Sequence, residues 1–196
     1  MGFIMPWWRK CSIKQYSIAC FWLCCVLGAP LSHAIDGIQI KSAELRQVSD
    51  QYVLYAQMNV TLTPLLQDAL NRGVSLYFIT DFTFMQPRWY WFAEELAHMT
   101  RVTRLSYNPL IRQYFVSGVN AGARSTDHLD AALAMLGDIN GWTVIARDKL
   151  SKITRYQATL SMRLDTSLLP KPLQINAIAT GRWDLEATPL VWTMNP

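Results

Sequence analysis

The chain has 196 residues, of which 51% are hydrophobic and 16% are charged, a composition that supports a packed core and excludes an intrinsically disordered chain. The formal net charge is +4, but three of the 18 basic residues precede residue 15 and all 14 acidic residues follow residue 34. Beyond residue 34 the net charge is +1, so no general electrostatic attraction to nucleic acid is expected.

The first 34 residues have the three parts of a secretory signal peptide. Basic residues precede an uncharged apolar run over residues 16–28, and Ser32 and Ala34 are the small residues of a cleavage site. The apolar run is shorter than the roughly 20 residues that span a bilayer. We therefore expect cleavage after Ala34, a periplasmic location, and one domain over residues 35–196. The alternative is an uncleaved N-terminal anchor, which would be the only contact with the membrane.

All four cysteines lie before residue 26. The domain over residues 35–196 therefore has no disulfide, no thiol nucleophile and no thiolate metal site.

Apolar and polar residues alternate along the first half of this domain. Residues 35–45 predict a first strand with a bulge or bend. Residues 52–62 are apolar at every even position, with Gln57 and Asn59 facing the other way, as in a half-solvated antiparallel strand. Thr63-Pro64 then predicts the start of a short helix that Gly73 ends. Residues 74–84 alternate again and predict another strand.

The second half continues this pattern. Strands are predicted over residues 102–107 and 110–117, around a turn at Asn108-Pro109, and the small residues 118–125 predict a loop. Ser125 or Thr126 is the expected N-cap of a second helix that ends at Gly137. The remaining strands are expected at residues 142–146, 156–164 and about 183–185, with a chain break at Leu169–Pro172 between the last two.

About eight strands and two short helices result. Because the strands follow one another rather than alternating with helices, the predicted fold class is α+β, mostly β: an antiparallel sheet or sandwich-like single domain.

Few residues have the types that catalysis requires. Asp127-His128-Leu129-Asp130 could suggest metal ligands, but neighbours on a helix point apart, and acidic residues favour a helix N-terminus. Asp165-Thr166-Ser167 is similar to the loop of aspartic proteases, although one lobe supplies only one of the two aspartates required. Glu94 and Glu95 diverge as adjacent residues. We expect no enzyme, no cofactor and no metal; an enzyme would need His98 or His128 to meet a carboxylate in a cleft.

The densest aromatic segment is Pro87–Phe92 (PRWYWF). One interpretation, which we favour, is that both of its faces pack within the protein, with arginines over the rings. The other is that one face is exposed for binding, since arginine and aromatic residues are enriched in binding hot spots. On that second interpretation the candidate interaction surface consists of Arg88, Trp89, Tyr90, Trp91, Arg104, Tyr107 and Arg112.

Several blocks resemble the DUF4390 family of uncharacterised bacterial proteins. They are Pro87–Phe92, Arg104–Tyr107, Arg112–Tyr114, Met162–Ser167, Leu169–Pro172 and Gln174–Ala177, in order across about residues 40–190. The resemblance implies an exported, mainly proteobacterial domain of unknown function without established catalytic residues. It also implies a genetic neighbourhood that often includes a membrane sensor histidine kinase. Where the family pattern has an acidic residue, this chain has Ala93, and Glu94 or Glu95 could substitute for it.

We therefore expect a non-enzymatic periplasmic interaction module whose partner is an envelope or inner-membrane protein, with a sensor kinase as one candidate. The alternative is a periplasmic binder of a lipid or another apolar small molecule. That alternative requires an apolar cavity lined by Phe78, Phe82 or Trp89, and a filled core would count against it.

Overall fold

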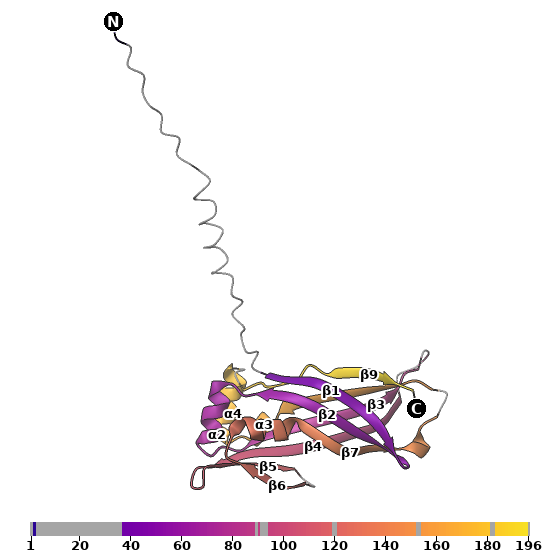
Figure 1. Cartoon of the computed structure of the whole chain (residues 1–196), viewed down its shortest axis with the longest axis horizontal. Coiled ribbons are helices and arrows are strands. Elements are labelled where there is room, and N and C mark those ends of the chain that lie inside the picture. Colours follow the sequence, from indigo (N-terminus) through magenta and orange to yellow (C-terminus); the bar gives the residue numbers. More distant parts are fainter. Residues whose placement is uncertain are drawn as a thin grey trace. The chain divides into compact units, whose positions relative to one another are not determined.

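The computed structural model describes residue 2 and residues 37–88, 90, 94–118, 121–151, 154–180 and 183–195. The expected signal peptide, apart from residue 2, lies outside the described residues, as do Trp89, Trp91 and Phe92. Nine strands in two antiparallel sheets and three α-helices make up the described part of the domain (Figure 1). The predicted class, α+β and mostly β, is confirmed.

The smaller sheet has three antiparallel strands in the order β1-β2-β7. These strands are β1 (Gly37–Val48), β2 (Gln51–Thr61) and β7 (Asp138–Ala146). As the alternation predicts, the even-numbered residues of β2 are buried, while Gln57 and Asn59 are exposed on the outer face. A bulge interrupts β1 between Ile40 and Ser42.

The larger sheet has six antiparallel strands in the order β6-β5-β4-β3-β8-β9. These strands are β3 (Leu76–Gln86), β4 (Glu94–Asn108), β5 (Gln113–Gly118), β6 (Ala121–Thr126), β8 (Tyr156–Leu164) and β9 (Leu190–Met194). All inward residues of β8 are buried as the sequence predicts, and β8 lies in the interior of the sheet between β3 and β9.

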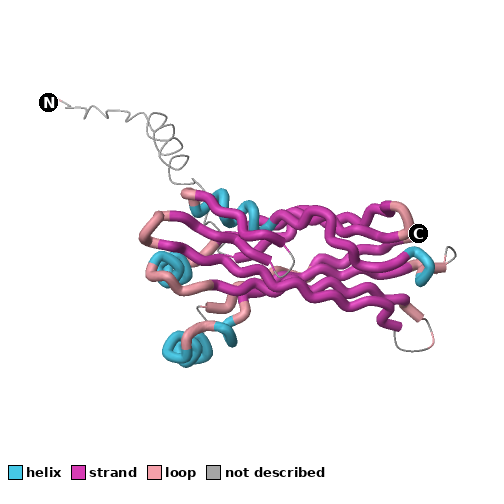
Figure 2. Tube along the Cα trace, turned by 90° about the horizontal axis from the view of Figure 1, so that it is seen from below, coloured by secondary structure: helices cyan, strands magenta, loops and turns pink. Residues whose placement is uncertain are grey.

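The inner faces of the two sheets enclose one hydrophobic core. Phe78, Phe82 and Phe84 on β3 are fully buried. The ring of Phe82 meets that of Trp142 on β7 edge-on, with centroids 6.5 Å apart, which joins the two sheets. Figure 2 shows the strands running along the molecule in two layers. Aromatic side chains thus fill the space between the layers.

Two helices lie at one end of the strands, α2 (Pro64–Asn71) and α4 (Lys171–Thr180) (Figure 1). The N-cap of α2 is Thr63, whose Oγ1 accepts a hydrogen bond from the Leu66 amide at 3.3 Å, as predicted. Helix α4 was not predicted: Leu169–Pro172 was interpreted only as a break, although proline is well tolerated in the first turn of a helix.

The third helix, α3 (Leu129–Gly137), lies against β2. Pairing between β7 and β2 stops at Gln57 and Asp138, where α3 ends and β7 begins. A Cβ added to Gly137 would lie 2.1 Å from the carbonyl oxygen of Met58, so glycine permits this close approach. The N-cap is His128, without a side-chain bond, rather than the expected Ser125 or Thr126.

Three further expectations were wrong in detail. Residues 118–125 were expected to form a loop, but Ala121–Thr126 pairs with β5, because a strand edge offers hydrogen bonds to any small-residue segment that reaches it. Strand β4 begins at Glu94 rather than at Val102, since β3 needs a partner along its whole length. The last strand is β9 rather than residues 183–185, and both Trp183 and Leu185 are buried in the core.

Candidate interaction surfaces

Arg104 lies on the outer face of the six-stranded sheet. Its guanidinium donates two hydrogen bonds to the hydroxyl of Ser75, at 3.1 and 2.9 Å, and lies over the ring of Tyr77 at 5.9 Å from the centroid. The ring and the hydroxyl hold the arginine in one orientation while its charge stays accessible to solvent. The sequence did not single out Ser75 or Tyr77, whose proximity depends on the pairing of β3 with β4.

Tyr107 packs against the residue that joins this end of the sheet to α2. Its ring packs on that of Tyr114, with centroids 4.6 Å apart, and the Tyr114 hydroxyl donates a hydrogen bond to Asn71 at 3.1 Å. Desolvation by burial, and secondarily the neighbouring Tyr107, raise the pKa of Tyr114 above its usual value. Tyr107 therefore has a structural contact, and it supports the neighbouring turn.

Arg112 lies on the turn between β4 and β5. The side-chain oxygen of Asn108 accepts a hydrogen bond from the Leu110 amide at 3.0 Å, and Arg112 has a φ of 53°. Leu110 is 91% exposed and Ile111 is 55% exposed. We call Leu110, Ile111 and Arg112 the apolar tip. The sequence indicates a turn at Asn108-Pro109 and makes Arg112 a candidate, but it does not distinguish the two aliphatic residues.

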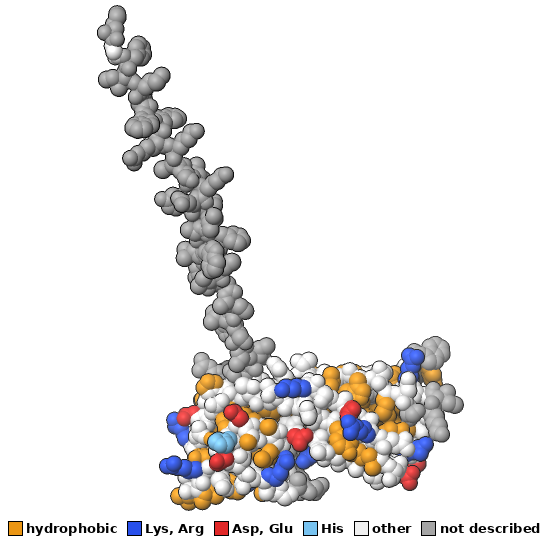
Figure 3. All heavy atoms as spheres, in the orientation of Figure 1, with side chains coloured by type: hydrophobic (Ala, Val, Ile, Leu, Met, Phe, Trp, Pro, Cys, Tyr) orange, Lys and Arg blue, Asp and Glu red, His pale blue; other side chains and the backbone are white. Residues whose placement is uncertain are grey.

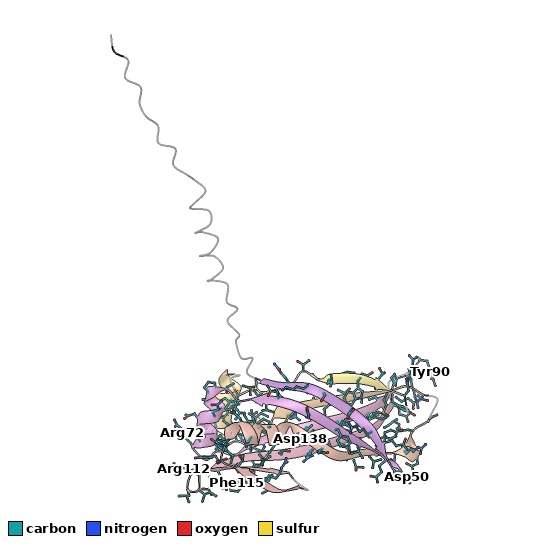
Figure 4. All side chains as sticks on the ribbon, in the orientation of Figure 1. Asp50, Arg72, Tyr90, Arg112, Phe115 and Asp138 are labelled. Carbon is teal, nitrogen blue, oxygen red and sulfur yellow. The ribbon has the colours of Figure 1, made fainter. Side chains whose placement is uncertain are left out.

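Arg88 and Tyr90 lie at the opposite end of the molecule from Arg112, as the labels for Tyr90 and Arg112 in Figure 4 show. Strand β4 separates the two groups by its 15 residues, about 45 Å at the usual rise of an extended chain. Arg88 forms an ion pair with Glu94, which thus provides a carboxylate next to Ala93. The described members of the predicted surface therefore form two separate groups.

Most residues with catalytic potential are exposed, and His98 lines a hollow of about 360 Å³. His128 Nε2 is 3.6 Å from Asp127 Oδ1, and both side chains are more than 70% exposed. His98 Nε2 is 3.9 Å from Asp81, whose Oδ1 also accepts a hydrogen bond from Thr100 at 2.7 Å. Asp165 accepts hydrogen bonds from the amide and the hydroxyl of Ser167, which makes it a turn residue. Among the described residues, no group of three or more His, Cys, Asp or Glu side chains could hold a metal ion.

The hollows of the domain lie outside its core. A groove of about 670 Å³ runs between α3 and the outer face of β2. The apolar ligand cavity of the alternative prediction was expected to be lined by Phe78 or Phe82. Both side chains are fully buried, and neither lines any of five hollows in the described part of the chain. Trp89 lies outside the described residues.

Figure 3 shows one face of the molecule, on which polar, charged and apolar side chains alternate over short distances. No helix in the described part of the chain has the length and apolar character that a membrane crossing requires.

The fold and its surfaces define a two-sheet antiparallel β domain with helices beside and at one end of the sheets. The model of the family named Domain of unknown function (DUF4390) matches residues 35–193, and the chain belongs to this family. No curated protein and no solved structure matches the chain significantly.

Proposed function

We propose that this protein is a non-enzymatic interaction module of the periplasm. The N-terminal segment exports it, and its partner is an envelope or inner-membrane protein. A membrane sensor histidine kinase is the candidate that the family resemblance suggests. The observation that carries the proposal is the apolar tip, Leu110, Ile111 and Arg112.

Two neighbouring aliphatic side chains at a turn differ from the usual composition of turns, which favour Gly, Pro, Asn, Asp and Ser. Single exposed apolar residues are common on protein surfaces. Leu110 and Ile111 are adjacent, however, and Arg112 follows them directly. An apolar patch with an arginine at its margin is typical of a protein contact, because burial of the aliphatic groups supplies affinity and the guanidinium supplies directed hydrogen bonds.

The apolar tip is also held in place by its surroundings. The Asn108 side chain bonds to the Leu110 amide on one side of the turn. Tyr107 and Tyr114 pack together at the adjoining ends of β4 and β5. A contact surface that is already ordered loses less conformational entropy when it binds, so the tip is suited to specific recognition.

The exposed positions of the acidic and imidazole groups support a non-enzymatic role. A general acid or base usually lies in a cleft, where burial or a neighbouring charge adjusts its pKa. The His98 and His128 side chains are 52% and 80% exposed, and each pairs with a single carboxylate among the residues that the structure describes.

Capture from the native envelope tests this proposal. The full chain with a C-terminal tag is expressed in its own cells and purified in mild detergent, and co-purifying proteins are quantified by mass spectrometry. We expect one membrane protein in near-stoichiometric amount. Leu110→Ser combined with Ile111→Ser should lower its recovery at least about tenfold, since both side chains lose their apolar burial.

Val48→Ser is the matched control. Val48 is a 48%-exposed aliphatic residue beside the β1–β2 turn, distant from the apolar tip. All variants should keep the wild-type unfolding midpoint, because exposed substitutions usually change stability little. Unchanged recovery with the Leu110→Ser and Ile111→Ser variant would contradict the proposed surface, and the absence of any captured envelope protein would contradict the proposed function.

A further inference from the structure

The groove along α3 has a floor formed by the outer face of the three-stranded sheet. Gln57, Asn59 and Thr61 occupy alternate positions of β2 and therefore project to the same side. The Gln67 amide lies at the rim, where its Nε2 donates a hydrogen bond to the carbonyl oxygen of Leu62 at 3.1 Å. The floor and rim thus present neutral amides and a hydroxyl.

Helix α3 forms the wall of this groove and, apart from Asp130, lines it with apolar residues and Gly137. The wall residues include Leu129, Leu133 and Ala134, of which Ala134 is exposed and Leu129 is partly exposed. The groove exists because Gly137 allows α3 to approach the backbone of Met58 directly. A ligand that lies on the polar floor would therefore contact an aliphatic surface along one side.

The charges at the groove cancel. Two basic side chains, Lys41 and Arg124, oppose two acidic ones, Asp130 and Asp138. Arg124 is already engaged, since its Nη2 donates a hydrogen bond to the carbonyl oxygen of Met135 at 3.0 Å. A site for phosphate or another anion would have an excess of basic groups, and a site for a lipid chain would have an apolar floor. Neither describes this groove.

A second hollow extends the same face toward the far end of the sheet. Its volume is about 450 Å³, and it shares Gln57 and Asp138 with the groove. Tyr55 and Asn140 also line it, together with Glu44 and Arg46, whose opposite charges form an ion pair. Asp138, labelled in Figure 4, lies where the two hollows meet. The two together form an elongated site rather than a compact pocket, which suits a chain-like ligand.

We propose that this elongated groove binds a linear, neutral, polyhydroxylated ligand, namely an oligosaccharide. Each sugar hydroxyl both donates and accepts hydrogen bonds, and side-chain amides such as those of Gln57 and Asn59 do the same. The aliphatic C–H face of a sugar ring matches the wall formed by Leu129 and Ala134. The site is separate from the apolar tip and does not depend on the proposed protein contact.

Nuclear magnetic resonance titration tests the site directly. The isotope-labelled full chain is titrated to millimolar concentration with three neutral probes: cellotetraose, maltotetraose and chitotetraose. We expect at least one of them to shift the side-chain amide signals of Gln57 and Asn59 together with the backbone signals of α3. The double substitution Gln57→Ala and Asn59→Ala should lower the affinity for that probe roughly tenfold, because two neutral hydrogen-bonding groups are lost.

Gln51→Ala is the matched control, because Gln51 is an exposed glutamine on the same strand that does not line the groove. It should bind the probe as the wild type does. The proposal is overturned if none of the three probes shifts these signals, or if the double variant binds as well as the control. It is also overturned if a tetramer of galacturonic acid, a carboxylated analogue, binds as tightly as the best neutral probe.

Discussion

Ser49 and Arg112 are the two residues other than glycine that have a positive φ in the described part of the chain, at 54° and 53°. A side chain in the left-handed region clashes with its own backbone, which costs roughly 1–2 kcal/mol relative to a right-handed conformation. At Arg112 this cost falls on a residue of the apolar tip. At Ser49 it falls on the β1–β2 turn, where no partner has been proposed.

Ser49→Gly should therefore stabilise the domain by about 1 kcal/mol, since glycine adopts a positive φ without a Cβ clash. The hydrogen bond from Gln47 to the Ser49 carbonyl oxygen uses only the backbone of residue 49 and should persist. Urea unfolding followed by tryptophan fluorescence measures the change. Asp50→Gly is the control. Asp50 lacks a positive φ, so this variant should not have a higher free energy of unfolding than the wild type. Equal or lower stability of Ser49→Gly would refute the assignment of strain.

Tyr114 links stability to alkaline pH. Because burial raises its pKa in the folded state, the unfolded chain loses the phenolic proton at a lower pH than the folded chain does. The protonated Tyr114 hydroxyl contributes fully to the free energy of unfolding below about pH 10. This contribution declines as the pH rises from there through the folded-state pKa. Tyr114→Phe should reduce this decline, because phenylalanine has no phenolic proton to lose. Near neutral pH the variant should have a free energy of unfolding roughly 1 kcal/mol lower than the wild type, because the hydrogen bond to Asn71 is lost. Unfolding curves at pH 7 and above pH 10 separate the two effects.

At the scale of elements, the contact between α3 and β2 determines where the groove lies. The pairing of β7 with β2 ends at Gln57, and α3 continues along β2 from there. Gly137 lies at the point of closest approach, where any side chain would meet the Met58 carbonyl oxygen. The residue that ends the helix is thus also the one that allows it to dock.

Gly137→Ala should destabilise the domain by about 2–3 kcal/mol, because its Cβ would overlap the Met58 carbonyl group and force α3 away from β2. Thermal unfolding by circular dichroism measures the loss. Gly122→Ala on β6 is a suitable comparison, since an added Cβ there meets no atom within 4 Å, and its stability should remain within about 0.5 kcal/mol of the wild type. Similar stability of both variants would show that α3 tolerates a looser contact.

At the scale of the whole molecule, the long strand β4 places the predicted binding residues at two ends. Arg88 forms an ion pair with Glu94 at the start of β4, whereas Tyr107 and Arg112 lie at its other end. Two separate groups can serve different contacts, and the end with the apolar tip combines two adjacent exposed aliphatic residues with an arginine. The outer face of the smaller sheet provides a third surface, on which the amides of β2 lie beside charged side chains of β1.

The proposed export predicts where the mature protein begins. Protein recovered from the periplasm should begin at Ile35, because the small residues Ser32 and Ala34 precede that bond. Intact mass and N-terminal sequencing measure this. The processed protein should also unfold at the same denaturant concentration with and without a reducing agent, since all four cysteines precede residue 26. Recovery of the full-length chain, anchored in the membrane, would contradict cleavage.

The sequence by itself determined the fold class, the buried faces of β2 and β8, the cap of α2 and the absence of cysteine from the domain. These features follow from local patterns, because strand periodicity and capping depend on residues close together in the chain. The outward orientation of Gln57 and Asn59 was predicted in the same way. What those two residues face could not be predicted, since the wall beside them comes from α3, some 70 residues later in the sequence.

Only the tertiary structure decided which of the candidate residues lie together. Whether Arg88 and Arg112 form one surface depends on the length and pairing of β4, and the start of β4 at Glu94 was not evident from its own sequence. Strand β6 likewise forms because the edge of β5 is available to it. The physical reason is that hydrogen bonds between strands and the docking of a helix join residues distant in sequence, and a local pattern does not record which distant partner satisfies it.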